Sequence, residues 1–176
     1  ASQIPHMYAP GNHEDESEPH EFEAYETRFY SPGSSSFWYS LNFEGVHIVS
    51  LSTEHNYDTG STQYGWLEGD LEAAHENREE VPWIVVFAHR PMYSSNNHGS
   101  EIEFRDAMEE LLYRYQVDLA IWGHDHGYER SYPVYQEGIY SNMTGTENEP
   151  YYQPGATIHV VVGMAGRSLY NDFDEP

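Results

Sequence analysis

Apolar runs typical of strands alternate with helical patterns after residue 60 of this 176-residue chain, and this alternation constrains the fold more than any other feature. Runs rich in β-branched and aromatic residues predict buried strands at residues 83–88, 117–122 and 157–162. Apolar residues at helical spacing predict helices at residues 63–74 and 102–115. Strands and helices that alternate in this way indicate a layered α/β architecture.

The first part of the chain carries shorter patterns. Residues 4–9 predict a buried strand, and residues 22–29 predict one or two helical turns. Residues 37–43 and 46–51 flank a tight turn and predict a hairpin. Near the other end, the polar residues 136–154 are expected to form a long loop or a β excursion.

The charge of the chain is strongly negative. Seven arginines and no lysine face 30 acidic residues, which gives a formal net charge of −23. Such a surface repels phosphate backbones and anionic lipid, so we expect no nucleic-acid partner. We interpret the acidity as a solubility feature rather than as an acidic binding face. The apolar stretches are too short to span a membrane.

Cysteine is absent, which excludes disulfides, thiolate ligands and cysteine nucleophiles. The chain starts with Ala1 and no charged-then-apolar leader stands before its first residues, so we expect a processed or excised chain. Asn142-Met143-Thr144 is a glycosylation sequon in a polar segment. The sequon and the processed start predict a secreted, extracellular glycoprotein, whereas the lack of cysteine leaves the compartment open.

Three histidine-bearing signatures stand at the ends of apolar runs: Gly11-Asn12-His13-Glu14, Val86-Phe87-Ala88-His89 and Gly123-His124-Asp125-His126. In open α/β sheets the loops that leave the carboxyl ends of strands form the ligand crevice. Amide oxygens and neutral imidazoles suit zinc, manganese or ferrous iron. Two such ions, about 3.5–4 Å apart, can polarise a phosphoryl oxygen and activate a water.

Each signature also has a simpler interpretation. His13 alone is more often a surface or capping residue, and a lone histidine at a strand end, such as His89, is usually structural. The pair His124 and His126 could belong to a solvated loop in a chain with 11 histidines. The three signatures together, in this order, favour a metal site.

The set resembles the last three of the five metallophosphoesterase signatures in the form used by purple acid phosphatases, particularly the iron/zinc tartrate-resistant enzymes of animal and plant type. Further segments carry the same resemblance: Trp38-Tyr39-Ser40, Ser52-Thr53-Glu54, Gln63-Tyr64, Trp66-Leu67-Glu68, His89-Arg90-Pro91-Met92-Tyr93, Tyr128-Glu129-Arg130 and Pro133-Val134-Tyr135. The resemblance implies a layered αββα sandwich that is incomplete on its N-terminal side. Residues 1–176 would then form a single, partial catalytic domain.

By this resemblance, Asn12, His89 and His124 would bind a divalent metal and His126 would bind a ferric ion. The implied cofactor is a binuclear centre of iron with zinc, manganese or a second iron. The first two signatures of the family are absent, and with them an aspartate ligand, the bridging aspartate and the tyrosine that colours the ferric site.

The resemblance also assigns residues beside the metals. His13 would stabilise the substrate phosphate or protonate the leaving alkoxide. His98 is either a second proton donor or a plain turn histidine. Asp125, between two histidine ligands, would point away from the metals.

The implied function is acid phosphatase-type hydrolysis of phosphomonoesters at acidic to neutral pH, by in-line attack of a hydroxide without a covalent enzyme intermediate. The missing ligands would come from an upstream segment or a partner chain, with oligomers left open. The alternative is a non-catalytic phosphatase-like protein with a binding or assembly role and one bound metal or none. A phosphodiesterase or nucleotidase of the same superfamily is disfavoured by the Val-x-x-His and Tyr-Glu-Arg contexts.

Overall fold

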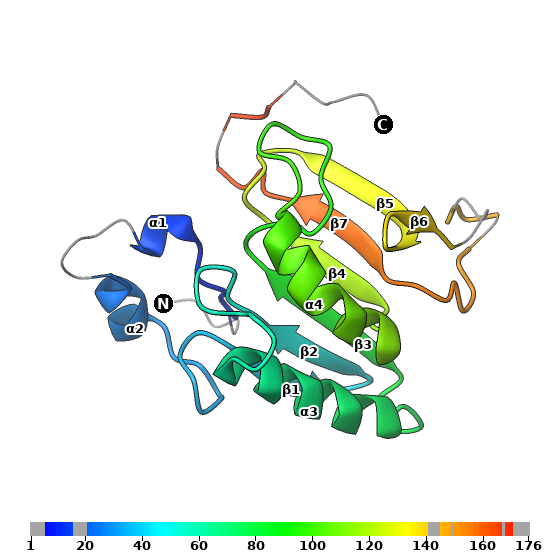
Figure 1. The fold of residues 1–176 in the computed structure, drawn as a ribbon, viewed down its shortest axis with the longest axis horizontal. Helices are drawn as coiled ribbons and strands as arrows, with labels where there is room; N and C mark the ends of the chain where they lie inside the picture. The colour runs from blue at the N-terminus through cyan, green and yellow to red at the C-terminus, as the bar shows by residue number, and fades with distance from the viewer. Residues whose placement is uncertain (1–5, 16–20, 141–144, 149, 167, 171–176) are drawn as a thin grey trace.

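A mixed sheet runs through the protein, with its strands in the order β1-β2-β3-β4-β7-β5-β6 (Figure 1). The computed structural model describes residues 6–15, 21–140, 145–148, 150–166 and 168–170. The strands are β1 (Tyr39–Phe43), β2 (Val46–Ser50), β3 (Trp83–Ala88), β4 (Leu119–Trp122), β5 (Tyr128–Tyr135), β6 (Gly138–Ile139) and β7 (Ile158–Val162).

The described residues form two short and two long helices. They are α1 (Asn12–Asp15), α2 (Glu23–Arg28), α3 (Thr62–Glu76) and α4 (Ile102–Arg114). The Ser61 hydroxyl caps α3 by accepting a hydrogen bond from the Tyr64 amide at 3.1 Å. The long helices pack against each other and cover the same face of the sheet (Figure 1). The α/β prediction is therefore confirmed, as are the expected helices.

Four neighbouring strands, β2, β3, β4 and β7, are parallel. Their carboxyl ends therefore meet at one edge of the sheet, and the loops that follow them lie together there. The expected hairpin is confirmed, since β1 pairs antiparallel with β2. β5 adds antiparallel to the outer side of β7.

The hydrophobic core lies between the sheet and the two long helices. In β3 the side chains of Ile84, Val86 and Ala88 are buried, and they alternate with more exposed neighbours. Leu67 of α3 and Leu111 of α4 are fully buried in the same cluster. Burial of one such leucine contributes about 1.5–3 kcal/mol, so this layer holds the loops at the sheet edge in place.

The opposite face of the sheet is also apolar. Ile48, Val85, Phe87, Ile121 and Val160 point to it and remain partly exposed. The described residues thus supply one sheet and one helical layer of the expected αββα sandwich. In that architecture a second sheet packs on this apolar face.

The strand predicted at residues 4–9 is wrong over the part that the structure describes, because the chain has no regular structure from His6 up to α1. Side-chain hydroxyls take the place of a strand partner here. The Tyr8 amide donates to the Tyr39 hydroxyl oxygen at 2.9 Å, and the Tyr8 carbonyl accepts from the hydroxyls of Tyr39 at 2.7 Å and Ser50 at 3.3 Å. Side-chain hydrogen bonds therefore hold this segment against the sheet, and its described residues make no backbone pairing with a strand. The preceding residues lie outside the described part of the chain.

The sequence patterns also missed β5. A register shift between Arg130 and Pro133 interrupts its pairing with β7, and proline removes a ladder donor, so no clean alternation marks this strand. The start of the polar segment 136–154 forms the β excursion, because β6 pairs back onto β5. Asn142, of the glycosylation sequon, lies outside the described residues.

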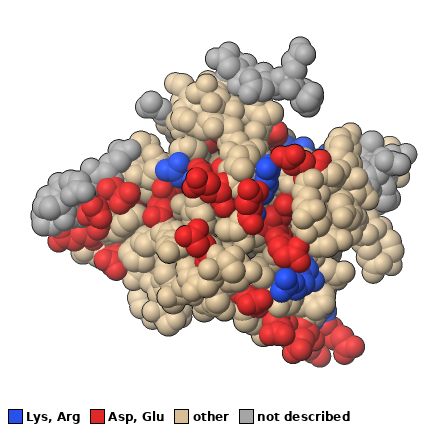
Figure 2. All heavy atoms as spheres, in the orientation of Figure 1, with Lys and Arg blue, Asp and Glu red and all other residues tan. Residues whose placement is uncertain are grey.

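The surface agrees with the composition. Figure 2 shows acidic side chains over much of the face that carries the long helices, with few basic ones among them. Among the residues that the structure describes, no helix is long and apolar enough to cross a membrane.

Candidate metal centre

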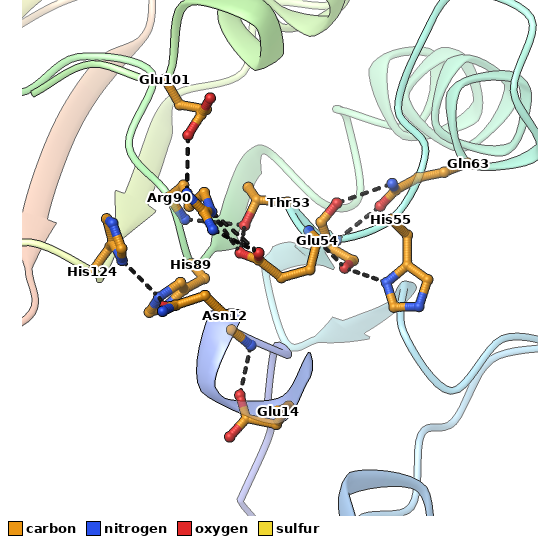
Figure 3. A network of polar contacts seen from close by, with 12 residues as sticks. Asn12, Glu14, Thr53, Glu54, His55, Gln63, His89, Arg90, Glu101 and His124 are labelled. Atoms are coloured by element: carbon orange, nitrogen blue, oxygen red, sulfur yellow. Dashed lines mark hydrogen bonds and ion pairs between the residues drawn. The ribbon is translucent and has the colours of Figure 1, made fainter. Parts of the chain in front are cut away.

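Three of the predicted ligands lie together, because two of them contact the same nitrogen atom of the third. His89 Nε2 lies 2.7 Å from Asn12 Oδ1 and 3.0 Å from His124 Nδ1 (Figure 3). The His89 and His124 rings meet edge to face, with their centroids 4.8 Å apart. Side chains from three distant parts of the sequence thus meet in one place.

The parallel sheet positions the two histidines. His89 follows β3 and His124 follows the adjacent β4, and the Gly123 amide donates to the His89 carbonyl oxygen at 2.9 Å. We call residues 123–127 the histidine loop. His124 has a φ of 65°, in the left-handed region, which turns the loop sharply at the strand end.

Asn12 is positioned differently from the prediction, since it begins α1 instead of following a strand. The Glu14 carboxylate accepts from the Gly11 amide at 2.7 Å, and this holds the entry to the helix. A Cβ atom on Gly11 would lie 2.9 Å from His89 Cγ and Nδ1. Glycine therefore lets the imidazole ring lie directly on the backbone beside Asn12.

Both central imidazoles favour the neutral form. Burial lowers the pKa of His89, and the nearby Glu54 carboxylate offsets only part of this effect. Burial, followed by the neighbouring His89 and His98, lowers the pKa of His124 to about 4. Neutral imidazole is the form that binds metal, so these histidines are ready ligands at neutral pH.

The donor set fits a divalent ion. Ligands about 2.1 Å from a common ion stand roughly 3.0–3.4 Å from each other, depending on the geometry, and the observed separations of 2.7 and 3.0 Å are close to that. The described residues contain no group of three or more histidine, cysteine, aspartate or glutamate side chains that could hold a metal. The third donor at this site is the amide oxygen of Asn12.

His126 is the second histidine of the histidine loop. Its Nδ1 is buried and has no hydrogen-bond partner among the described residues. Its ring stacks on Tyr170 at 4.6 Å, and the Tyr170 amide donates to the His126 carbonyl oxygen at 3.0 Å. A buried nitrogen without a partner costs free energy, and a metal ion would remove that cost. This observation fits the ligand role expected for His126.

The two predicted proton donors border the same centre. The His98 ring lies 4.4 Å from that of His124, and His98 Nε2 is 3.2 Å from the Tyr170 hydroxyl. His13 is exposed on α1, and its charge contributes to lowering the pKa of His89. Their catalytic roles stay predictions.

The sequence patterns did not predict the ion pair that joins Glu54 and Arg90 next to His89. The Arg90 Nε donates to both carboxylate oxygens of Glu54 at 2.9 and 3.2 Å, and a terminal nitrogen donates at 3.0 Å (Figure 3). Burial raises the pKa of Glu54, but its hydrogen bonds to Arg90 outweigh this and leave the pKa below its ordinary value. Two features of the sequence could have pointed to this ion pair. An acidic residue, Glu54, stands shortly after β2, and a basic residue, Arg90, directly follows His89.

A cavity of about 370 Å³ adjoins this ion pair. Its lining comprises Thr53, Glu54, His55, Asn56, Tyr57, Asp58, Arg90, Glu101 and Glu103. Four carboxylates against one arginine make it a poor site for an anion.

Comparison with known proteins identifies the family of the chain. The model of the calcineurin-like phosphoesterase family matches residues 1–128. Acid phosphatase type 7 of Danio rerio is 39% identical over 98% of this chain and 44% of its own length, and the Homo sapiens protein of that name is 37% identical over 94% and 41%. The solved structure of purple acid phosphatase PPD1 from yellow lupin (Lupinus luteus) seeds matches with a TM-score of 0.84 and 30% identity, over 98% of this chain and 33% of that one.

The chain thus spans less than half the length of these curated relatives. The family match nevertheless covers most of it, including all three histidine signatures. The chain belongs to the calcineurin-like phosphoesterase family and is a purple acid phosphatase-like member of it.

Proposed function

We propose that this chain supplies the divalent-metal side of a binuclear centre that hydrolyses phosphomonoesters. The observation that carries the proposal is the convergence of Asn12 Oδ1 and His124 Nδ1 on His89 Nε2, within 2.7 and 3.0 Å. Both contacts can be hydrogen bonds in the absence of metal, and the same three atoms carry lone pairs of the kind that a divalent cation binds. The acid phosphatase names of the relatives support the same reaction class.

Asn12, His89 and His124 would hold the divalent ion, and His126 would contribute to a second site for iron. The expected pair is iron with zinc, manganese or a second iron. Bound metals of this kind polarise a phosphoryl oxygen and lower the pKa of a bound water. The remaining ligands, carboxylates above all, would come from an upstream segment or a partner chain.

The residues of the chain itself bind the phosphate and supply the proton. With a net charge of −23, most of the surface repels a phosphoester, and cations bound at the histidine cluster would reverse the sign there. In their protonated forms His13 and His98 would hydrogen-bond the phosphate oxygens. Either imidazolium would then give its proton to the leaving alkoxide, a contribution of about 100-fold or more in rate.

A non-catalytic role is the second candidate, and one observation favours it. The part of the chain that the structure describes contains no group of three or more histidine, cysteine, aspartate or glutamate side chains that could hold a metal. Asn12, His89 and His124 would therefore hold at most one ion. Such a protein would keep the fold for binding or assembly. Secretion, glycosylation and oligomerisation are compatible with either proposal, and the sequon supports the first two.

Metal content and hydrolysis, measured on one purified sample that includes any upstream segment or partner chain of the native protein, test the two candidates. Two ions per chain together with hydrolysis of p-nitrophenyl phosphate support the enzyme, and both should be lost in His89→Ala. His75→Ala is a matched control, because His75 lies in the last turn of α3 and bonds the Tyr115 carbonyl. One ion or none, with no hydrolysis, would support the binding role.

A further inference from the structure

We propose that Asp125 is a positioning residue, whose carboxylate holds the turn at residues 94–100 so that the His98 imidazole lies against His124. The inference rests on the proposed function insofar as His98 acts on substrate. It assigns a role to the one polar side chain of the Gly-His-Asp-His signature that binds no metal in the ligand scheme above.

The Asp125 carboxylate is fully buried and bonded at both oxygens. Oδ2 accepts from the Ser94 hydroxyl at 2.7 Å, and Oδ1 accepts from the backbone amide of His98 at 3.0 Å. The Asp125 amide donates to the Gly123 carbonyl oxygen at 2.8 Å, and its own carbonyl accepts from the Gly127 amide at 2.9 Å. The residue is therefore rigid, and it grips the turn at two points.

A second carboxylate reaches the same turn from β5. Glu129 accepts from the Ser95 amide at 3.1 and 2.9 Å, and the Ser94 hydroxyl lies 3.4 Å from it. Glu129 holds the start of the turn, whereas Asp125 bonds the backbone amide of His98. The two carboxylates therefore act at different points of the turn, and the bond from Asp125 is the one made to the histidine itself.

The His98 side chain has little else to hold it. It is exposed, and its contacts are the Tyr170 hydroxyl at 3.2 Å and the ring of His124. Gly99 follows directly with a φ of 74°, a conformation that glycine adopts at low cost but does not enforce. The place of the imidazole therefore depends on where its own backbone is held.

Burial of the Asp125 carboxylate between two loops costs free energy, because the charge is removed from water. Its position between His124 and His126 makes the histidine loop and the His98 turn one unit. Movement of the metal ligands and movement of the proton donor are thereby linked. This linkage is what a proton donor needs in order to stay aligned with a metal-bound phosphate.

The first test is independent of catalysis. In the wild type, nuclear Overhauser contacts between the His98 and His124 imidazole protons are expected. Asp125→Ala should remove them. Asp125→Asn should retain them, because its amide oxygen can still accept from the His98 amide. Asp118→Asn, at the other end of β4, is the matched control and should leave the contacts intact. Unchanged contacts in a folded Asp125→Ala would overturn the proposal.

Ser94→Ala covers the case in which Asp125→Ala does not fold, as judged by circular dichroism. It removes one of the two bonds to the carboxylate and leaves the charge in place, so the His98 contacts should weaken while the metal affinity of Asn12, His89 and His124 stays within about threefold. Intact His98 contacts in Ser94→Ala, together with a loss of contacts in Asp125→Asn, would mean that charge rather than hydrogen bonding matters, and would contradict the inference.

The second test uses hydrolysis of phenyl phosphate, because its phenolate leaving group needs a proton whereas p-nitrophenolate does not. His98→Ala should lower kcat about 100-fold if His98 is a proton donor, and Asp125→Ala about 10-fold with little change in KM. The double variant should match His98→Ala within about twofold, because a positioning residue has no effect without the residue that it positions. A further 10-fold loss in the double variant would overturn the inference. A wild type with no hydrolysis would count against the proposed function only, since the imidazole contacts are read separately.

Discussion

Gly163, at the end of β7, packs so tightly on the histidine loop that a Cβ atom there would lie 2.1 Å from the carbonyl oxygen of Asp125. The contact is to backbone, which cannot rotate away as a side chain can. The carboxyl end of β7 therefore sets how far the histidine loop can extend.

Gly163→Ala should consequently displace the histidine loop. We expect a loss of about 1–3 kcal/mol in the free energy of unfolding, as for overpacked cores, measured by urea denaturation. Zinc affinity, measured by calorimetry, should fall in the same variant because His124 moves with the loop.

The control for this variant is Gly65→Ala. Gly65 lies within α3 and has open space around its Cα. Replacing it should stabilise the protein by up to about 1 kcal/mol, the difference in helix propensity. Equal effects of the two substitutions would show that the close contact at Gly163 has no consequence.

Asn12→Ala should weaken zinc binding about 100-fold or more. The amide oxygen is one of three donors at the site, and loss of groups that merely orient metal ligands already costs 10–100-fold. Calorimetric titration with zinc measures the change. Asn77→Ala serves as the control, since Asn77 ends α3 and is exposed. An unchanged affinity in Asn12→Ala would exclude this oxygen as a ligand.

Arg90→Met should destabilise the protein by about 2–3 kcal/mol, because it leaves the largely buried Glu54 carboxylate without its partner. The figure is at the low end for such pairs since Arg90 is partly exposed. Adding Glu54→Gln should recover part of the loss, which urea denaturation of the single and double variants would reveal. Arg114→Met is the surface control, and no measurable change is expected there because both partners of Arg114 are exposed.

His159 should make stability depend on pH. Burial lowers its pKa to about 3 from an ordinary value of 6.5. Between these two pH values the unfolded chain therefore binds a proton at His159 that the folded protein does not bind. Stability is therefore full above pH 6.5 and falls as the pH drops toward 3, by about 1.4 kcal/mol per pH unit for one proton.

His159→Gln checks this dependence, because a glutamine oxygen can still accept from Trp122 Nε1, which bonds His159 at 3.1 Å. Between pH 6 and pH 4 the variant should lose less stability than the wild type in urea titrations. Parallel curves would assign the acid sensitivity to other groups, such as His124.

The strands with dense β-branched sequence were predictable from sequence because no competing pattern exists in them. β3 matches its expected range residue for residue, and β4 and β7 differ from theirs only at the first residues. The segment at Tyr8 was not predictable in this way. Its backbone groups bond the hydroxyls of distant side chains, and no local pattern encodes such partners.

The part of the candidate site that directly follows the parallel strands was predictable from the sequence. His89 and His124 follow adjacent parallel strands, so their proximity follows from topology alone. The Glu54–Arg90 pair and the attachment of Asp125 to the 94–100 turn depend on the paths of loops. Loop paths are set by individual contacts rather than by periodicity, and sequence patterns carry little information on them.

The contact between Asn12 and His89 joins residues 77 positions apart. Closing a loop of that length costs about 4 kcal/mol in chain entropy, before a constant that depends on the chain. The hydrogen bonds among Asn12, His89 and His124 do not offset this entropy cost. The three side chains therefore come together only once the parallel strands have paired. Metal uptake during refolding should therefore trail the appearance of β structure, and a bound ion becomes a reporter of completed folding rather than its nucleus.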